Sequence, residues 1–179
     1  MSDADRIRWD DKYAQRDEPD SVGPPDMLAP FQHVVPESGL ALDLGCGQGR
    51  HSVWLALRGL AVCGVDISLV AIERARELAR RNGVGEHCVF DVLDLDDGLP
   101  PSAAVDVVLC HRFRDPRLDQ AIVERLTPGG LLAMVTRSEV GDAPGHFRAR
   151  PGELVAAFAE LDIIDAGEGN GQAWLLARR

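Results

Sequence analysis

Apolar and polar positions alternate between two patterns from Gly39 onward. Short runs of mostly apolar residues have the length of buried strands, and longer stretches between them repeat apolar residues at helical spacing. This alternation is typical of βαβ units around a mostly parallel sheet. The pattern predicts five strands, at Leu40 to Leu44, Ala61 to Val65, about His87 to Phe90, Val105 to Cys110 and Leu131 to Thr136.

The stretches between the strands predict helices that cover the sheet. Ser68 is a typical N-cap, and the Asn82-Gly83 pair is a typical stop. The predicted helices run from about Arg50 to Arg58, from Ser68 to Asn82, from Pro116 with Asp115 as its cap, and from Pro151 along Leu154, Val155, Phe158 and Leu161. Residues 127–130 predict a turn, and residues 138–150 have a loop composition.

The two ends of the chain complete the expected fold. Residues 3–16 predict a helix, and residues 162–166 and 173–177 predict a terminal hairpin that turns around 167–171. We therefore expect an α/β fold, a Rossmann-like three-layer α/β/α sandwich with a seven-stranded, mostly parallel sheet and an antiparallel C-terminal hairpin strand. We expect one domain over 1–179, with 1–36 as a helical cap and 37–179 as the core.

The segment that carries most chemical information joins the first predicted strand to the first predicted helix. It places Gly45, Gly47 and Gly49 in a tight turn before the N-terminus of the helix, where free N–H groups favour a nucleotide-like ligand. A dinucleotide-binding enzyme uses G-x-G-x-x-G at this place, whereas the spacing here is G-x-G-x-G. Asp43, just before the turn, is unfavourable beside a pyrophosphate and suits a cationic ligand. S-adenosylmethionine carries a sulfonium and an ammonium and no phosphate.

With these residues in view, the segment 43–49 resembles the first motif of class I S-adenosylmethionine-dependent methyltransferases. The segment 65–68 resembles the family's acidic position after the second strand, which implies that Asp66 holds the ribose hydroxyls and that Ile67 lies beside it. Asp91 and Val92 resemble the segment that receives the adenine, with Asp94 as the competing choice. The Pro-Gly-Gly turn at 128–130 is similar to the turn before the family's fifth strand.

Within this class, the Trp-Asp-Asp-Lys-Tyr run at 9–13 and the segment 43–56 are most similar to the tellurite-resistance and thiopurine methyltransferase group. In that group such a helix covers the cofactor, which implies that Trp9 and Tyr13 form a lid, although ordinary helix packing explains them equally well. Cys46 is expected to be a small residue in a tight turn at the cofactor rather than a nucleophile. Arg50 is a candidate for the cofactor carboxylate.

His111 and Arg112 follow the carboxyl end of the fourth predicted strand, where open α/β sheets gather their ligands. They are candidates for the acceptor side of the pocket, and a solvated loop is the alternative. Direct in-line transfer gains its rate mainly from proximity and orientation. A soft acceptor such as a thiolate needs no base, whereas a hydroxyl does, and His111 or Tyr13 would then be the catalytic base.

Composition narrows the partners. The net charge of -10 disfavours nucleic acid and anionic membranes, so a small-molecule acceptor is expected, with the chain acting as a monomer or homodimer. The four cysteines lack zinc or disulfide spacing, so we expect no metal and reduced thiols. The N-terminus lacks the layout of a signal peptide, which predicts a cytoplasmic protein. Two alternatives remain: an NAD(P)-dependent Rossmann oxidoreductase, and a regulatory protein that binds S-adenosylmethionine without turnover.

Overall fold

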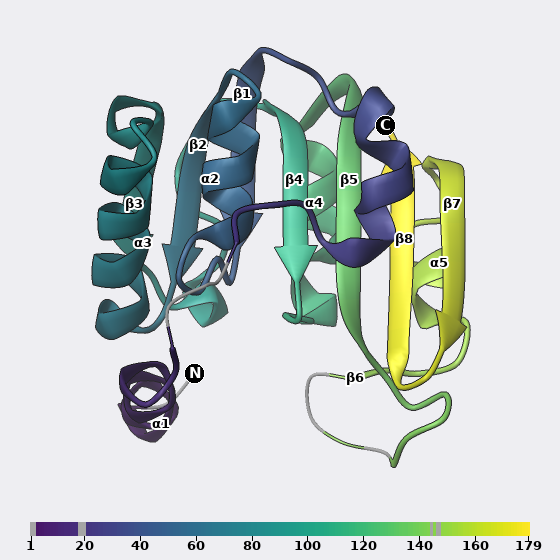
Figure 1. The fold of residues 1–179 in the computed structure, drawn as a ribbon. Helices are drawn as coiled ribbons and strands as arrows, with labels where there is room; N and C mark the ends of the chain where they lie inside the picture. Colours follow the sequence, from purple (N-terminus) through teal and green to yellow (C-terminus); the bar gives the residue numbers. More distant parts are fainter. Residues whose placement is uncertain (1–2, 18–20, 144, 146–147) are drawn as a thin grey trace.

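The chain folds into a mixed β-sheet with helices on both faces, as expected (Figure 1). The computed structural model describes residues 3–17, 21–143, 145 and 148–179. The strands are β1 (Gly39–Leu44), β2 (Leu60–Asp66), β3 (Cys88–Val92), β4 (Val105–His111), β5 (Leu126–Ser138), β6 (Arg148–Ala149), β7 (Asp162–Gly169) and β8 (Gln172–Arg178). The α-helices are α1 (Asp3–Ala14), α2 (Arg50–Leu57), α3 (Leu69–Arg81), α4 (Asp119–Arg125) and α5 (Glu153–Ala157). Short 3₁₀ helices are η1 (Asp26–Val34), η2 (Gly85–His87), η3 (Leu95–Asp97) and η4 (Pro116–Leu118).

The main path of the sheet has the order β3-β2-β1-β4-β5-β8-β7, with β6 beside β5. The pairs between β3 and β5 are parallel, whereas β8 is antiparallel to both β5 and β7. The predicted terminal hairpin is therefore confirmed. Its turn is Asn170-Gly171, and both residues have the positive φ that a two-residue type I′ hairpin turn requires.

Alternating side chains of the central strands form two separate cores, one on each face of the sheet. In β4, Val107 and Leu109 join the core beneath α2, α3 and η1, whereas Val108 and Cys110 join the core beneath α4 and α5. Figure 1 shows the same division, with α2, α3 and η1 in front of the sheet and α4 and α5 behind it. Strands covered on both faces are nearly all apolar, which explains why the sequence predicted them well.

Several predicted boundaries are wrong. The strand predicted at about 87–90 extends to Val92 because it pairs with β2 as far as Asp66. The turn predicted at 127–130 is a bulge within β5, where the register shifts between Val105 and Val107 of β4. The predicted helix after Pro151 is only Glu153–Ala157, because the chain turns at Phe158 to enter β7.

Two further differences concern loops and helix starts. The helix predicted from Pro116 begins as the 3₁₀ turn η4, with Asp115 accepting from the N–H of Arg117, and continues as α4. The predicted loop at 138–150 contains the short strand β6, and residues 144, 146 and 147 of that loop lie outside the described residues. None of the helices in the described ranges has the length and apolar composition needed to cross a bilayer.

Candidate active site

A cavity of about 840 Å³ lies at the carboxyl edge of the parallel strands. Its wall includes residues 45–48 after β1, residues 66–67 at the end of β2, and residues 111–113 at the end of β4. The order of strands reverses beside β1, since β2 and β3 lie on one side of it and β4 and β5 on the other. Open α/β sheets bind ligands at such a switch point, and the volume lies in the range of small-molecule sites.

The glycine turn after β1 requires its glycines. Gly45, Gly47 and Gly49 have φ values of 68°, 53° and 78°, a region that other residues rarely adopt. A Cβ on Gly47 would lie 2.8 Å from the hydroxyl oxygen of Tyr13, so the turn is also closely covered by α1. A Cβ on Gly49 would lie 2.7 Å from the Cβ of Ala75 in α3. Gly49 therefore allows helix packing and does not line the cavity.

Asp43 is a buried carboxyl group at the floor of the cavity, with 1% of its surface exposed. It points to the face of the sheet that α2 covers, and the Ser52 hydroxyl donates to its Oδ2 at 2.5 Å. Burial raises the pKa of Asp43 to about 7, although the hydrogen bond from Ser52 opposes this shift. A cationic ligand beside Asp43 would favour its ionised form.

Asp66 lies at the end of β2 and lines the same cavity. Its Oδ2 accepts from the N–H of Gly47 at 2.9 Å, and its Oδ1 accepts from the N–H of Ser68 at 3.0 Å. Burial raises the pKa of Asp66, and these two hydrogen bonds oppose the shift. Each carboxylate oxygen has a second lone pair, so Asp66 can hold the glycine turn and still accept from a ligand.

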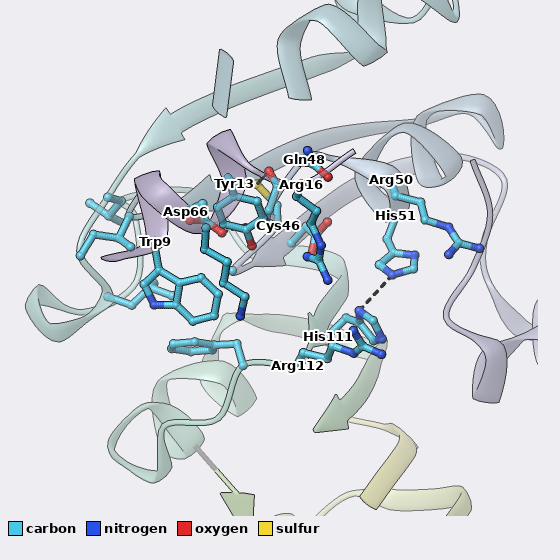
Figure 2. A pocket seen from close by; sticks show the side chains of 18 of the residues that line it. Trp9, Tyr13, Arg16, Cys46, Gln48, Arg50, His51, Asp66, His111 and Arg112 are labelled. Atoms are coloured by element: carbon cyan, nitrogen blue, oxygen red, sulfur yellow. Dashed lines mark hydrogen bonds between the residues drawn. The ribbon is translucent and has the colours of Figure 1, made fainter. Parts of the chain in front are cut away.

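Two histidines form a hydrogen-bonded pair at the opposite side of the cavity (Figure 2). Nδ1 of His51 lies 2.8 Å from the carbonyl oxygen of Gly23, which can only accept, so Nδ1 carries the hydrogen. In the neutral ring, Nε2 of His51 is then an acceptor, and it lies 3.1 Å from Nδ1 of His111. His111 therefore donates through Nδ1 and keeps a lone pair on Nε2.

Both rings of this pair are neutral near pH 7. Burial lowers the pKa of His51 to about 4 and that of His111 to about 3, and the pair and the nearby arginines add to the shift of His111. A neutral His111 whose tautomer is fixed by a neighbour is suited to accept a hydrogen bond or a proton at Nε2. The arrangement can therefore serve a proton-bearing ligand in the cavity.

Helix α1 forms the outer wall of the cavity. Trp9 and Tyr13 both line it and stack with their ring centroids 5.8 Å apart. Figure 2 shows both rings on the side of the cavity where Asp66 and Cys46 lie. Tyr13 is buried, and burial raises its pKa, so the phenol stays protonated at neutral pH. Its hydroxyl is consequently a donor rather than a base.

Two buried donors at the cavity have no partner among the described residues. They are Nε2 of Gln48, in the glycine turn, and Nε of Arg50, at the start of α2. An unpaired buried donor costs free energy of about 1–3 kcal/mol, so such groups commonly await a ligand or water. Both donors would suit the carboxylate of a bound molecule.

The structure brings most of the predicted site residues to one cavity. Those that line it are Trp9, Tyr13, Asp43, Gly45, Cys46, Gly47, Arg50, Asp66, Ile67 and His111. Cys46 is buried, and burial raises its pKa, so its thiol stays protonated as expected for a turn residue. Arg112, the other predicted acceptor-side residue, also lines the cavity.

Asp91 and Val92 are placed differently from the prediction. They are exposed residues at the end of β3 and do not line the cavity. Because β3 extends through Val92 rather than ending at Phe90, the loop that turns toward the cavity begins two residues later than predicted, at Leu93. Leu93 and Leu95 line the cavity instead, and the N–H of Leu93 donates to the carbonyl of Asp66 at 3.0 Å.

Sequence reasoning did not identify three residues of the site as functional. His51 had no local signal, because its partner His111 lies 60 residues away in sequence. Ser52 was hidden for the same reason, since it meets Asp43 only when α2 packs on the sheet. Gln48 could have been noted, because a polar amide between two glycines of a ligand-binding turn has few protein neighbours to satisfy it.

Comparison with known proteins identifies the family of the chain. Residues 41–130 match the family described as a methyltransferase domain. The chain is 34% identical over 144 residues to the ribosomal protein L11 methyltransferase of Dechloromonas aromatica, covering 77% of this chain and 44% of that protein. It is 33% identical over 118 residues to the ribosomal RNA small subunit methyltransferase C of Alcanivorax borkumensis, covering 60% of this chain and 35% of that protein. The chain thus spans less than half the length of these two relatives.

Solved structures show the same fold. TehB from Haemophilus influenzae superimposes with a TM-score of 0.78 at 20% identity, covering 96% of this chain and 67% of that chain. An S-adenosylmethionine dependent methyltransferase from Mesorhizobium loti superimposes with a TM-score of 0.69 at 18% identity, covering 84% of this chain and 96% of that one. The chain therefore belongs to the methyltransferase domain family, and it has the fold of S-adenosylmethionine dependent methyltransferases.

Proposed function

We propose that this chain transfers a methyl group from S-adenosylmethionine to a small-molecule acceptor. One observation supports this proposal most strongly: two buried carboxyl groups and a neutral histidine line the same cavity at the switch point of the sheet. The carboxyl groups suit the cationic donor, and the histidine suits an acceptor that must lose a proton.

The residues at the floor of the cavity fit the cofactor. Asp43 offers a negative charge to a cation, and Asp66 offers free lone pairs to the ribose hydroxyls. The unpaired donors of Gln48 and Arg50 match the cofactor carboxylate. Ile67, Leu93 and Leu95 offer apolar surface to the adenine. They take the role that the sequence had given to Asp91 and Val92, which are exposed outside the cavity. Trp9 and Tyr13 cover this part of the cavity from α1.

S-adenosylmethionine, when bound, supplies an activated methyl group. The residues of this chain hold the acceptor in line with that group and exclude water, which accounts for most of the rate gain. His111 accepts the acceptor's proton at Nε2 when the acceptor is a hydroxyl or a thiol. A base with a low pKa is sufficient, because a proton on an atom that is being methylated becomes strongly acidic.

His51 positions His111 for this task. Its ring is fixed by the Gly23 carbonyl, and it accepts from Nδ1 of His111, which keeps the lone pair of His111 on Nε2. Tyr13 is less suited to the role of base because its raised pKa keeps the phenol protonated. Tyr13 therefore acts as a cover for the glycine turn and as a donor.

The relatives include enzymes named for ribosomal protein and ribosomal RNA, so the choice of a small molecule rests on this chain's own features. The net charge of -10 disfavours a large polyanion, and the reacting region is a cavity walled by α1 rather than an open face.

The four cysteines are all free thiols, which supports the proposed cytoplasmic location.

Formation of S-adenosylhomocysteine tests the function. The protein would be incubated with S-adenosylmethionine and, in separate reactions, with thiols, phenols, amines and intact ribosomal subunits. We expect turnover with at least one small molecule and a loss of about 100-fold in kcat in His111→Leu for a hydroxyl acceptor. Turnover with ribosomal subunits alone would contradict the small-molecule assignment, and cofactor binding without any turnover would favour the regulatory alternative.

A further inference from the structure

Four cations of an acidic protein gather at the mouth of the cavity. Lys12 belongs to α1, and Arg16 follows the end of that helix. Arg112 follows β4 and Arg137 lies near the end of β5, and all four residues line the cavity. We call this group the cationic rim. Its members come from three regions that are far apart in sequence. They form a local cluster of positive charge in a chain whose net charge is -10.

The rim residues differ in their ion pairing from a nearby structural arginine. In the described parts of the chain, no ion pair joins a carboxylate to any of the four. Arg114, only two residues beyond Arg112, shows the contrast, because it is buried and bonded to both Asp119 and Glu153. The charge of the buried Arg114 is thus neutralised by its carboxylate partners. The rim cations, by contrast, are exposed to solvent and to the cavity.

Three carboxyl groups line the cavity, those of Asp17, Asp43 and Asp66. Among the described residues, none of the three forms an ion pair with a member of the rim. Asp66 is used by the N–H groups of Gly47 and Ser68, and Asp43 accepts from Ser52 beneath the glycine turn. Asp142, next to Arg137 in the neighbouring smaller cavity, is already paired with Arg148 at 2.5 Å. The positive charge of the rim is therefore available to a ligand.

The rim cations are close enough to repel one another. Burial lowers the pKa of Lys12, and Arg16 and Arg137 lower it further. Nζ of Lys12 also lies 4.0 Å from the centroid of the Trp9 ring, which holds the ammonium toward the cavity. A cluster of like charges whose members form no ion pair among the described residues is stabilised when an anion joins it.

The backbone places Arg112 in a conformation that arginine rarely adopts. Its φ is 62°, in the left-handed region, while its N–H donates to the carbonyl of Val135 at 2.7 Å. Such conformations persist mostly where function requires them. Arg112 also lines a second cavity of about 270 Å³ together with Arg137. Figure 2 shows Arg16 and Arg112 on opposite sides of the space in front of His111.

We propose that the cationic rim binds an oxyanion group, a carboxylate or a phosphate, of the methyl acceptor, so that the acceptor is a small organic anion. This inference rests on the proposed function, because it assigns the acceptor to the same cavity. The anionic group is held by the rim, and the atom to be methylated lies toward Nε2 of His111, the residue next to Arg112 in the chain. Arg50 is not counted in the rim, because the proposed function assigns it to the cofactor carboxylate.

A small anion fits this surface better than RNA. An RNA site needs positive charge along an extended face, and the remaining surface carries the carboxylates that make the chain acidic. The four cations instead converge on one cavity mouth, where focusing of the field attracts a compact anion. The rim is therefore suited to one or two oxyanion groups.

Binding of inorganic phosphate and of acetate to the protein saturated with S-adenosylhomocysteine tests the inference. Calorimetric titrations at constant ionic strength would compare the wild type, the double variant Arg112→Gln/Arg137→Gln, and Arg80→Gln. Arg80 lies on α3 outside the cavity, so its variant removes charge without touching the rim. We expect saturable binding of at least one of the two anions to the wild type and to Arg80→Gln, and at least fivefold weaker binding to the double variant. Whichever of phosphate and acetate binds more tightly indicates whether the acceptor carries a phosphate or a carboxylate.

A kinetic comparison separates this inference from the proposed function. With 4-mercaptobenzoate and 4-mercaptobenzamide as acceptors, the wild type should show at least a tenfold lower KM for the carboxylate, and the double variant should not distinguish the two. Turnover of both acceptors with equal KM in the wild type, together with no saturable binding of either anion, would overturn the rim proposal and leave the methyltransferase function intact. Binding of a 12-nucleotide RNA that is tighter than either anion and is lost in the double variant would assign the rim to nucleic acid instead. Failure of S-adenosylhomocysteine to bind at all would contradict the proposed function itself.

Discussion

Asp43 shows how a single residue links the sheet to the ligand. Its carboxyl group is enclosed by β1 and α2, and only the Ser52 hydroxyl among the described side chains is recorded as donating to it. The sequence identified Asp43 because it lies near the end of a strand just before the glycine turn, and Asp66 because it ends the second strand, where the family resemblance implies an acidic residue. The sequence could not identify Ser52 or His51, because the contacts that give them a role cross from a helix to a distant strand.

Replacement of Asp43 by Asn should change both stability and cofactor affinity with pH. The pKa of Asp43 is raised from 3.8 to about 7, so the folded state holds this proton more tightly than the unfolded state does. The stability of the ligand-free wild type therefore falls as pH rises from about 4 to 7, by an amount on the order of 4 kcal/mol at most. Asp43→Asn should have a higher Tm than the wild type at pH 8, measured by calorimetry without ligand.

The affinity for S-adenosylmethionine should change in the opposite direction. In the wild type it should strengthen as pH rises from 6 to 8, because Asp43 becomes charged, and in Asp43→Asn it should be about tenfold weaker at pH 8 with little pH dependence. Asp97→Asn, at an exposed position outside the cavity, is the matched control. A variant that binds as tightly as the wild type at pH 8 would remove Asp43 from the cofactor site.

The histidine pair gives a second prediction for single residues. His51→Leu should lower kcat for a hydroxyl acceptor by about 10-fold or more with little change in KM, because the tautomer of His111 is no longer fixed. His51→Gln should restore part of the rate, since its amide oxygen can accept from Nδ1 of His111. Steady-state kinetics of the two variants and of His51→Leu/His111→Leu would test this.

The variant His51→Leu/His111→Leu should be no slower than His111→Leu alone, because His51 acts through His111. At saturating substrates, protonation of this pair should not lower kcat of the wild type between pH 8 and 5.5, since the pKa values of both rings are about 4 or lower. Additive losses in the double variant would show that His51 acts independently of His111.

Among the helices, α1 lies beyond the end of the sheet rather than over one of its faces (Figure 1). It packs on α3 through Asp10, which accepts from the Ser68 hydroxyl at 2.6 Å and from the N–H of Val70 at 3.3 Å. The sequence predicted this helix and the central strands closely, because their apolar repeats are local. It overestimated α5, because the chain turns at Phe158 to enter β7, and it missed β6, because that two-residue strand depends on its pairing with β5.

Removal of the Asp10 contacts should loosen α1 while α3 stays intact. Asp10→Ala should weaken binding of S-adenosylhomocysteine about tenfold and increase amide hydrogen exchange in α1, because Trp9 and Tyr13 then cover the cavity less firmly. The exchange of α3 should change little, since Ser68 still caps that helix through the N–H of Ala71. Asp11→Ala, on the exposed side of the same helix, serves as the control. Unchanged affinity together with unchanged exchange in α1 would exclude α1 as a cover.

At the scale of the whole molecule, total charge and local charge lead to different expectations. The net charge of -10 predicted a chain that disfavours nucleic acid and anionic membranes, whereas the folded chain gathers four cations at the mouth of its main cavity. The net charge summed over the sequence could not show this, because the cations lie on and just after α1, after β4 and on β5. The fold class was predictable from the alternation of strands and helices, and the strand order was predictable only from the family resemblance.

Calorimetric titration of the purified chain with S-adenosylmethionine and, in parallel, with NADH tests the account most directly. The site has two buried carboxyl groups and unpaired donors for one carboxylate, so we predict saturable binding of S-adenosylmethionine at one site per chain and no heat from NADH. Saturable binding of NADH with none of S-adenosylmethionine would contradict the account.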